Sequence, residues 1–215
     1  MGAKVENDFS TPIQLHHIQL SKKNYFCIYI LKLMKKATLT ALKYPTGEFK
    51  MPKKFTEKEL ESRIKILEEF PSRLRKEVKK MKEKELEYRH RLGGWTVRQI
   101  VHHCADSHVN AYVRTKLAYT ELNPTVKPYD ESAWANTGDS GEAPVEWSLI
   151  LLEGLHKRWC MLLSELNEEE LKRTYFHPEQ NKKVALGYLI FLYSWHCEHH
   201  LAHVKQAKKH KNKFK

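Results

Sequence analysis

Residues 184–208 combine two properties that few folds can accommodate together. Up to Trp195 the segment is apolar on nearly every side, and it then continues into the string WHCEHHLAH, which carries four histidines. A helix that is apolar all round has to be covered by other elements on every side. The sequence therefore predicts a buried helix here, with a cluster of imidazoles at its buried level.

The four histidines of this string follow the helical repeat. They stand at i, i+3, i+4 and i+7 and are His196, His199, His200 and His203. A helix projects residues at this spacing from one side, and neutral imidazole is the commonest metal ligand in proteins. Two imidazoles one turn apart can share a divalent ion. Two pairs have that spacing: His196 with His200, and His199 with His203. A merely polar, pH-sensitive helix end is the alternative, but buried histidines need partners that satisfy them.

Three further segments have helical periodicity, and almost nothing in the chain has the pattern of a strand. The first begins after Thr56 and the second after Thr96, and each threonine is followed three residues later by Glu or Gln, as in a capping box. The second runs to about Leu122 and the third covers about residues 145–166. Pro71 is expected to bend the first helix near its middle. Four helices without strands predict an all-α fold, a four-helix bundle.

A long loop of roughly 20 residues joins the second helix to the third, and loops of that length are uncommon unless they are functional. Its aromatic residues favour a packed lid, and those of this stretch are Tyr129, Trp134 and Trp147. The second helix contains the string HHCADSH, so it is the best source of a third metal ligand from across the bundle. The candidates are His102, His103 and His108, and periodicity does not choose among them.

The remaining histidines are most simply surface residues or hydrogen-bonded structural ones: His16, His17, His90, His156, His177 and His210. The four cysteines form no CxxC pair, as expected of reduced, mostly buried thiols. Cys104 and Cys197 neighbour histidines of interest, but an adjacent helical residue points about 100° away, which favours packing over ligation. The HExxH motif is absent, which argues against a zinc peptidase of the thermolysin type.

The net charge of +12 is concentrated at the C-terminus, because residues 205–215 carry six lysines and no acid. Residues 34–204 carry only +4, which is an ordinary mixed surface. No nucleic-acid-binding motif accompanies the lysines, so we expect no nucleic-acid partner. The apolar run 25–31 is too short to span a membrane and lacks a signal-peptide cleavage site. We therefore expect a cytoplasmic protein that is not bound to a membrane.

Composition divides the chain into three parts. Residues 1–33 look unlike the rest, and we expect a disordered extension or sequence upstream of a true start at Met34. The bundle is expected over residues 34–207, which is long enough for one domain with a real core. Residues 208–215 are expected to form a basic tail.

Several separated stretches resemble the DinB superfamily, and more closely its YfiT-type branch of metal-dependent hydrolases. Over roughly residues 34–205 they stand in the family's order: LKYPTGEFK, GGWTVRQIVHHCADSHVNAYVRTKLAYTE, KPYDESAW, HKRW and YSWHCEHHLAH. The resemblance implies a four-helix bundle, a homodimer, and one zinc or nickel ion per subunit held by three histidines. The positions that match the family's ligands are His103, His196 and His200. The resemblance places the other two histidines of the C-terminal string, His199 and His203, beside the site.

The leading functional hypothesis is a hydrolase that acts on a small molecule. Three neutral imidazoles leave a divalent ion with its full charge and with open positions, so it can activate water for attack on a polarised carbonyl. The candidate lid groups are Tyr129, Asp130 and Trp134. The candidate acceptors for an imidazole N–H are Asp106 and Glu198, and no general base is assigned.

Two alternatives come from different classes. A metal-dependent S-transferase would use a low-molecular-weight thiol of the bacillithiol type, because a coordinating thiol is deprotonated. Basic residues near the site would then recognise the acidic thiol. A non-enzymatic metal-binding module would instead need a fourth protein ligand and no water, with Cys104 or Cys197 as the first suspects.

Overall fold

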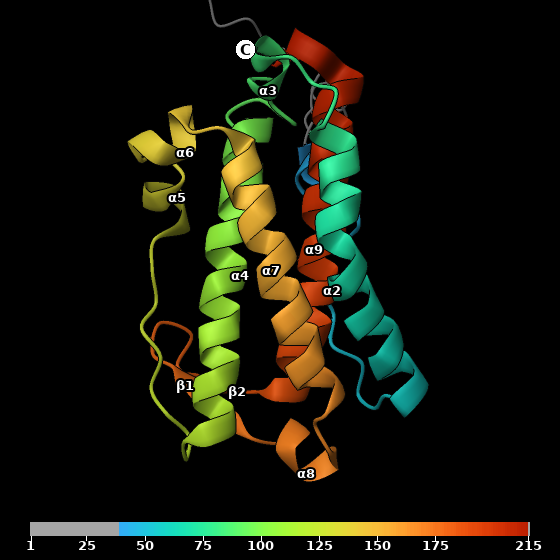
Figure 1. Ribbon diagram of the computed structural model, residues 1–215, viewed down its shortest axis with the longest axis vertical. Helices are drawn as coiled ribbons and strands as arrows, with labels where there is room; N and C mark the ends of the chain where they lie inside the picture. The colour runs from blue at the N-terminus through green and yellow to red at the C-terminus, as the bar shows by residue number, and fades with distance from the viewer. Residues whose placement is uncertain (1–38, 215) are drawn as a thin grey trace, which may run out of the picture. The chain divides into compact units, whose positions relative to one another are not determined.

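The computed structural model describes residues 39–214, so the extension expected over residues 1–33 lies outside the described part. The four long helices of this part are α2 (Glu57–Val78), α4 (Val97–Thr120), α7 (Val145–Ser164) and α9 (Leu186–His210). Both α7 and α9 pack against α2 and against α4, so the four helices close a bundle (Figure 1). The predicted four-helix bundle is confirmed. No helix in residues 39–214 has the length and apolarity to cross a membrane.

Two of the helices begin at the predicted capping boxes. Thr56 and Thr96 each accept a hydrogen bond from the backbone N–H three residues further on, and the side chains of Glu59 and Gln99 accept the N–H of the cap. These reciprocal bonds satisfy amide groups that a helix leaves without partners in its first turn. The box at Thr96 therefore sets the first turn of α4, the helix that carries His103.

The C-terminal helix continues past the expected end of the bundle at residue 207. It runs to His210 and is followed by the short helix η1 (Lys211–Lys213). Lys208 donates to the backbone carbonyl of Glu77 at 2.8 Å and to its carboxylate at 2.7 Å, which joins this end of α9 to α2. Part of the basic tail is thus continuous with the bundle.

A small antiparallel hairpin is the element that the periodicity did not predict. Its strands are β1 (Thr174–His177) and β2 (Lys182–Ala185), and it stands between α8 (Glu168–Leu171) and α9. Strands of four residues are too short to show a decisive alternation, and their residues resemble a loop. Tyr175 pairs with Val184 across the hairpin, and both side chains are buried against the core.

The long connection between α4 and α7 is packed, as expected of a lid. It contains two short helices, α5 (Glu131–Trp134) and α6 (Gly138–Glu142), both of which contact α4. Gln99 of α4 donates to the backbone carbonyl of Ala135 at 2.7 Å, which ties the connection to the helix. A further short helix, α3 (Glu83–Leu86), contacts α4 as well.

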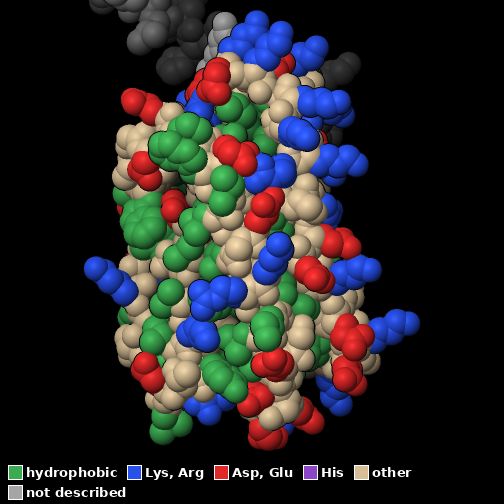
Figure 2. Space-filling model, in the orientation of Figure 1, with side chains coloured by type: hydrophobic (Ala, Val, Ile, Leu, Met, Phe, Trp, Pro, Cys, Tyr) green, Lys and Arg blue, Asp and Glu red, His purple; other side chains and the backbone are tan. Residues whose placement is uncertain are grey.

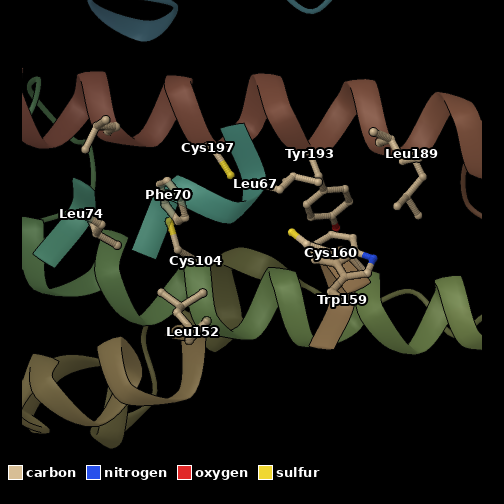
Figure 3. Packing of buried hydrophobic residues seen from close by; sticks show 14 of the residues in the cluster. Leu67, Phe70, Leu74, Cys104, Leu152, Trp159, Cys160, Leu189, Tyr193 and Cys197 are labelled. Carbon is tan, nitrogen blue, oxygen red and sulfur yellow. The ribbon is translucent and has the colours of Figure 1, made fainter. Parts of the chain in front are cut away.

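The core lies between the four long helices. Trp159 of α7 is fully buried, and its indole N–H donates to the hydroxyl of Thr115 on α4 at 3.0 Å. Its ring meets that of Tyr193 of α9 edge-on at a centroid distance of 5.5 Å. Figure 3 shows Cys104 and Cys197 pointing into the same core. Both thiols are free and fully buried, and burial raises their pKa, so they are packing groups.

Candidate metal centre

The structure brings together three of the histidines singled out from the sequence. His103 of α4 and His196 and His200 of α9 each offer one ring nitrogen, and these three atoms lie within 4.8 Å of one another. His103 and His200 are buried, whereas His196 keeps part of its surface open. The group contains no cysteine and no carboxylate from residues 39–214, so neither thiol suspected of being a fourth ligand belongs to it.

The spacing of these nitrogens fits a divalent ion. The Nε2 atoms of His103 and His196 lie 3.3 Å apart. Two imidazole nitrogens bound tetrahedrally to one zinc ion at about 2.0–2.1 Å would lie about 3.3–3.4 Å from each other. His200 adds a third, buried imidazole, and one ring nitrogen of each of the three histidines lies within 4.8 Å of the others. The residues present therefore fit a metal ion.

Burial keeps the three imidazoles neutral. It lowers the pKa of His103 to about 4, with the neighbouring His203 as a lesser cause. It lowers the pKa of His196 and of His200 well below the ordinary value of 6.5, and the other site histidines add to the effect. Neutral imidazole is the form that binds a metal ion, so the electrostatic environment prepares these side chains for ligation.

An aromatic ring covers this group. The ring of Trp95 lies 4.5 Å from that of His103 and stacks over His200 at 6.3 Å, both measured between centroids. Trp95 precedes the cap of α4, so the capping box that begins the helix also places the indole over the site. An indole at this position limits access of water from its side.

A pocket of about 270 Å³ reaches His200. Its lining residues are Lys43, Tyr44, His90, Arg91, Gly93, Gly94, Trp95, Ser132, His199, His200 and His203. The lining contains two cations and no carboxylate, which favours an anionic ligand. The backbone turn in this wall has its left-handed residue at Gly93, with a φ of 64°, and a Cβ on the next residue, Gly94, would lie 2.5 Å from the ring of His90.

The two other histidines of the C-terminal string line this pocket. His203 contacts the backbone carbonyl of Lys43 through Nε2 at 3.0 Å and stacks on His90 at a centroid distance of 4.0 Å. His199 stacks on Trp195 at 4.5 Å. Both therefore stand beside the three-histidine group and outside it, where the family resemblance places them.

Neither of the two carboxylates expected to accept an imidazole N–H does so, and that expectation is wrong. Glu198 forms an ion pair with Arg73 of α2. Asp106 is half-buried, with a pKa raised to about 6 by burial, and its side chain bonds no imidazole of the described part. The second ring nitrogen of His196 instead lies 3.0 Å from Nε2 of His108, which the sequence had offered only as a possible ligand.

None of the three candidate lid groups lines the pocket at His200. The ring of Tyr129 packs on that of Trp134 at 4.6 Å, and Asp130 caps α5 by accepting the N–H of Ala133 at 2.8 Å. The residue of this connection that lines the pocket at His200 is Ser132. It follows Glu131 on the short helix α5, and no motif in the sequence distinguished it.

A larger hollow lies away from the histidines. It has a volume of about 970 Å³ and lies between α2, α7, α8 and the start of α9, where Phe55, Leu60 and Leu171 contribute to its lining. No histidine or cysteine lines it. Volume alone would select this hollow, but its lining offers no group of metal ligands, so the chemistry points to the smaller pocket.

The fold and the site together define a helical bundle of the metal-binding class, with three histidines converging from two facing helices. A family model described as the DinB superfamily matches residues 66–204. This chain belongs to the DinB superfamily.

Curated relatives cover most of the chain. A Bacillus cereus protein (strain ATCC 10987) named "Putative metal-dependent hydrolase" is 47% identical over 171 residues, which are 80% of this chain and 98% of that protein. A Bacillus thuringiensis subsp. konkukian protein of the same description has the same identity and coverage. The solved structure of YfiT from Bacillus subtilis, described as a probable metal-dependent hydrolase with an unusual four-helix bundle topology, is 42% identical. It matches with a TM-score of 0.77 over 79% of this chain and 97% of that chain.

The buried histidines predict that the metal-free protein loses stability in mild acid. Burial lowers the pKa of His90 to about 3 and that of His156 to about 4, and both side chains are at most 3% exposed. An unfolded histidine titrates near pH 6.5, so below that pH the unfolded chain binds more protons than the folded one. The stabilisation is complete above about pH 6.5 and is lost as the pH falls to about 4 for His156 and to about 3 for His90.

Each of the two histidines should remove roughly 1 kcal/mol from the free energy of unfolding between pH 6 and pH 5. Urea denaturation of the metal-free protein at the two pH values measures the total. In His90→Gln the difference should shrink by roughly 1 kcal/mol. An unchanged difference in this variant would contradict the assignment of a buried, neutral His90.

Proposed function

We propose that this protein is a metal-dependent hydrolase of a small molecule, in which His103, His196 and His200 hold one zinc or nickel ion per subunit. The observation that carries the proposal is the convergence of three neutral ring nitrogens from α4 and α9 within 4.8 Å. The descriptions of the Bacillus relatives and of YfiT as metal-dependent hydrolases support it.

The chemistry follows from a ligand set without charge. A divalent ion held by three neutral imidazoles keeps its full charge and open positions, and it lowers the pKa of a bound water toward about 7. The residues of the chain hold the imidazoles neutral by burial and shield them with Trp95. Lys43 and Arg91, on the wall of the pocket that reaches His200, would orient an anionic group of the substrate.

The same wall supports a second candidate function. A metal-dependent S-transferase would bind a low-molecular-weight thiol of the bacillithiol type, and ligation to the ion would deprotonate the thiol. Lys43 and Arg91, with no carboxylate among the lining residues, suit an acidic thiol as well as an acidic substrate. The two candidates share the metal ligands and differ in what occupies the open positions.

A homodimer in the cytoplasm completes the proposal. Helix α7 exposes large apolar side chains at helical spacing: Trp147 at 65%, Ile150 at 57%, Leu151 at 48% and Met161 at 68%. In Figure 2, hydrophobic side chains lie among charged ones on the face where α4 and α7 run. Such residues support a contact with a second copy of the chain. The free, buried thiols of Cys104, Cys160 and Cys197 support a reducing compartment.

Removing a proposed ligand should remove the metal. His103→Ala, His196→Ala and His200→Ala should each lower zinc affinity by more than about 100-fold, because changes to groups outside the ligands typically cost 10–100-fold. Elemental analysis after dialysis, together with zinc competition against a chelator, measures the loss. The matched controls His199→Ala and His203→Ala come from the same helix and should retain about one ion per subunit. Loss of metal in these controls alone would contradict the ligand set.

Hydrolysis and thiol transfer give different responses in the metal-loaded protein. With zinc or nickel bound, the hydrolase proposal predicts turnover of some member of a panel of small acidic esters, amides and lactones, abolished in His103→Ala. Titration of the nickel-loaded protein with small acidic thiols is followed by its absorption spectrum. If no ester, amide or lactone of the panel is hydrolysed and a thiol changes the absorption spectrum, the hydrolase proposal is contradicted and the S-transferase proposal is supported.

Placing a charge on α7 should break the proposed dimer. Ile150→Glu is expected to shift the protein from dimer to monomer, because a carboxylate would be buried without a partner in an apolar contact. Light scattering coupled to gel filtration measures the mass. Leu122→Glu is the matched control, since Leu122 is 98% exposed but lies outside α7. A wild-type monomer, or dissociation in the control alone, would contradict this interface.

A further inference from the structure

An unbroken line of hydrogen bonds crosses the core and ends on His196. Nδ1 of His156 on α7 lies 2.6 Å from the carbonyl oxygen of Leu67 on α2, and Nε2 of His156 lies 2.7 Å from Nδ1 of His108 on α4. Nε2 of His108 then lies 3.0 Å from Nδ1 of His196 on α9. We call these four residues the histidine chain, and each long helix of the bundle contributes one of them.

The histidine chain begins at a backbone carbonyl that has no hydrogen-bond donor within its own helix. In an α-helix the carbonyl of residue 67 accepts the N–H of residue 71, but residue 71 is proline and has none. Leu67 is 0% exposed, so this carbonyl needs a donor from within the protein. His156 supplies it. Pro71, for which the sequence predicts only a bend, thus leaves free the carbonyl of Leu67 at which the histidine chain begins.

The direction of each hydrogen bond follows from that carbonyl. A carbonyl only accepts, so the proton of His156 lies on Nδ1, and in a neutral imidazole the other nitrogen must accept. Nδ1 of His108 therefore donates to His156, and Nδ1 of His196 donates to His108. Burial lowers the pKa of His156 to about 4, which keeps that ring neutral near pH 7. Nε2 of His196 is therefore the unprotonated nitrogen of that ring, and it lies 3.3 Å from Nε2 of His103.

We propose that the histidine chain sets the tautomer of His196, so that its Nε2 presents a lone pair to the metal ion before the ion arrives. This inference rests on the proposed ligand set. His108 and His156 would then be positioning residues for the metal site. His200 differs, because its Nδ1 has no hydrogen-bond partner in residues 39–214. His196 is thus the ligand that the core anchors.

Aromatic packing holds the rings of the chain in place. Phe70 lies 5.3 Å from the ring of His108 and 5.8 Å from that of His156. Tyr193 meets His108 edge-on at 5.4 Å, and Trp159 meets His156 edge-on at 5.8 Å. His108 and His156 are 0% and 1% exposed, so solvent does not compete for their hydrogen bonds. Rotation of either imidazole would require these large side chains to move.

The tautomers can be measured directly in the metal-free protein. Two-bond nitrogen–proton correlation spectra of protein labelled with ¹⁵N-histidine distinguish a proton on Nδ1 from one on Nε2. We expect the Nδ1–H tautomer for His156, His108 and His196 in the wild type near pH 7. An Nε2–H tautomer at His196 would overturn the proposal whatever the metal affinity of the protein.

Zinc affinity tests whether the histidine chain acts on the metal site. His156→Phe keeps a ring and removes both nitrogens, and it should weaken zinc binding by about 10–100-fold in competition with a chelator. His156→Gln should return the affinity to within a few-fold of the wild type, because its amide can donate to Leu67 and accept from His108. His102→Phe is the matched control, because His102 of α4 is likewise a buried histidine with two hydrogen bonds but lies outside the histidine chain.

The outcomes separate this inference from the proposed function. Equal weakening in His156→Phe and His156→Gln would assign His156 to packing and overturn the proposal, as would wild-type affinity in His156→Phe. If His156→Phe does not fold by circular dichroism, the wild-type tautomers and His156→Gln still decide. A wild type with the expected tautomers but no affinity for zinc would contradict the proposed ligand set and support the hydrogen-bonded order of the chain.

Discussion

The burial of imidazole is the constraint on which the rest of this structure depends. Helix α9 is apolar through its first turns and packs against both α2 and α4, so its histidines enter the same interior. A charged imidazole is poorly solvated there, and each ring remains neutral with one donor and one acceptor. The bundle satisfies many of these groups with one another: His108 with His156, His108 with His196, and His103 with His196. The polar interior is therefore made largely of histidine.

The fold could be predicted from the sequence because its signals are local. Capping boxes at Thr56 and Thr96 and the apolar periodicity place the long helices to within about two residues. The hairpin could not be predicted because strands of four residues show no decisive alternation of apolar and polar residues, and its paired residues meet only in the folded chain. The choice of the three converging histidines depended on a family resemblance. The spacing alone left two possible ligand pairs on α9 and three candidate ligands on α4.

The surroundings of the site could not be predicted, because they are set by contacts between helices. The sequence suggests Glu198 as an acceptor only because it lies close to His196 along the chain. Two residues apart on a helix means about 200° of rotation, so Glu198 points away and pairs with Arg73 of α2. The observed partner, His108, comes from α4. The contact made at the proline of α2 could not be predicted for the same reason. Its lack of an N–H can be read from the sequence, whereas the donor that replaces it arrives from α7.

The proposed ligand set has one side fixed by the core and another open to a pocket. His196 is held through His108 and His156 against the backbone carbonyl of Leu67, and the side chains of His108 and His156 are at most 1% exposed. His200 lines the pocket that also contains Lys43 and Arg91. Neutral ligands contribute no negative charge to offset a divalent ion, and the lining of the pocket adds only positive charge. An anion entering the pocket would therefore meet attraction from the wall and from the ion together. Acidic substrates or acidic thiols are therefore favoured over neutral ones, whether the proposed reaction is hydrolysis or thiol transfer.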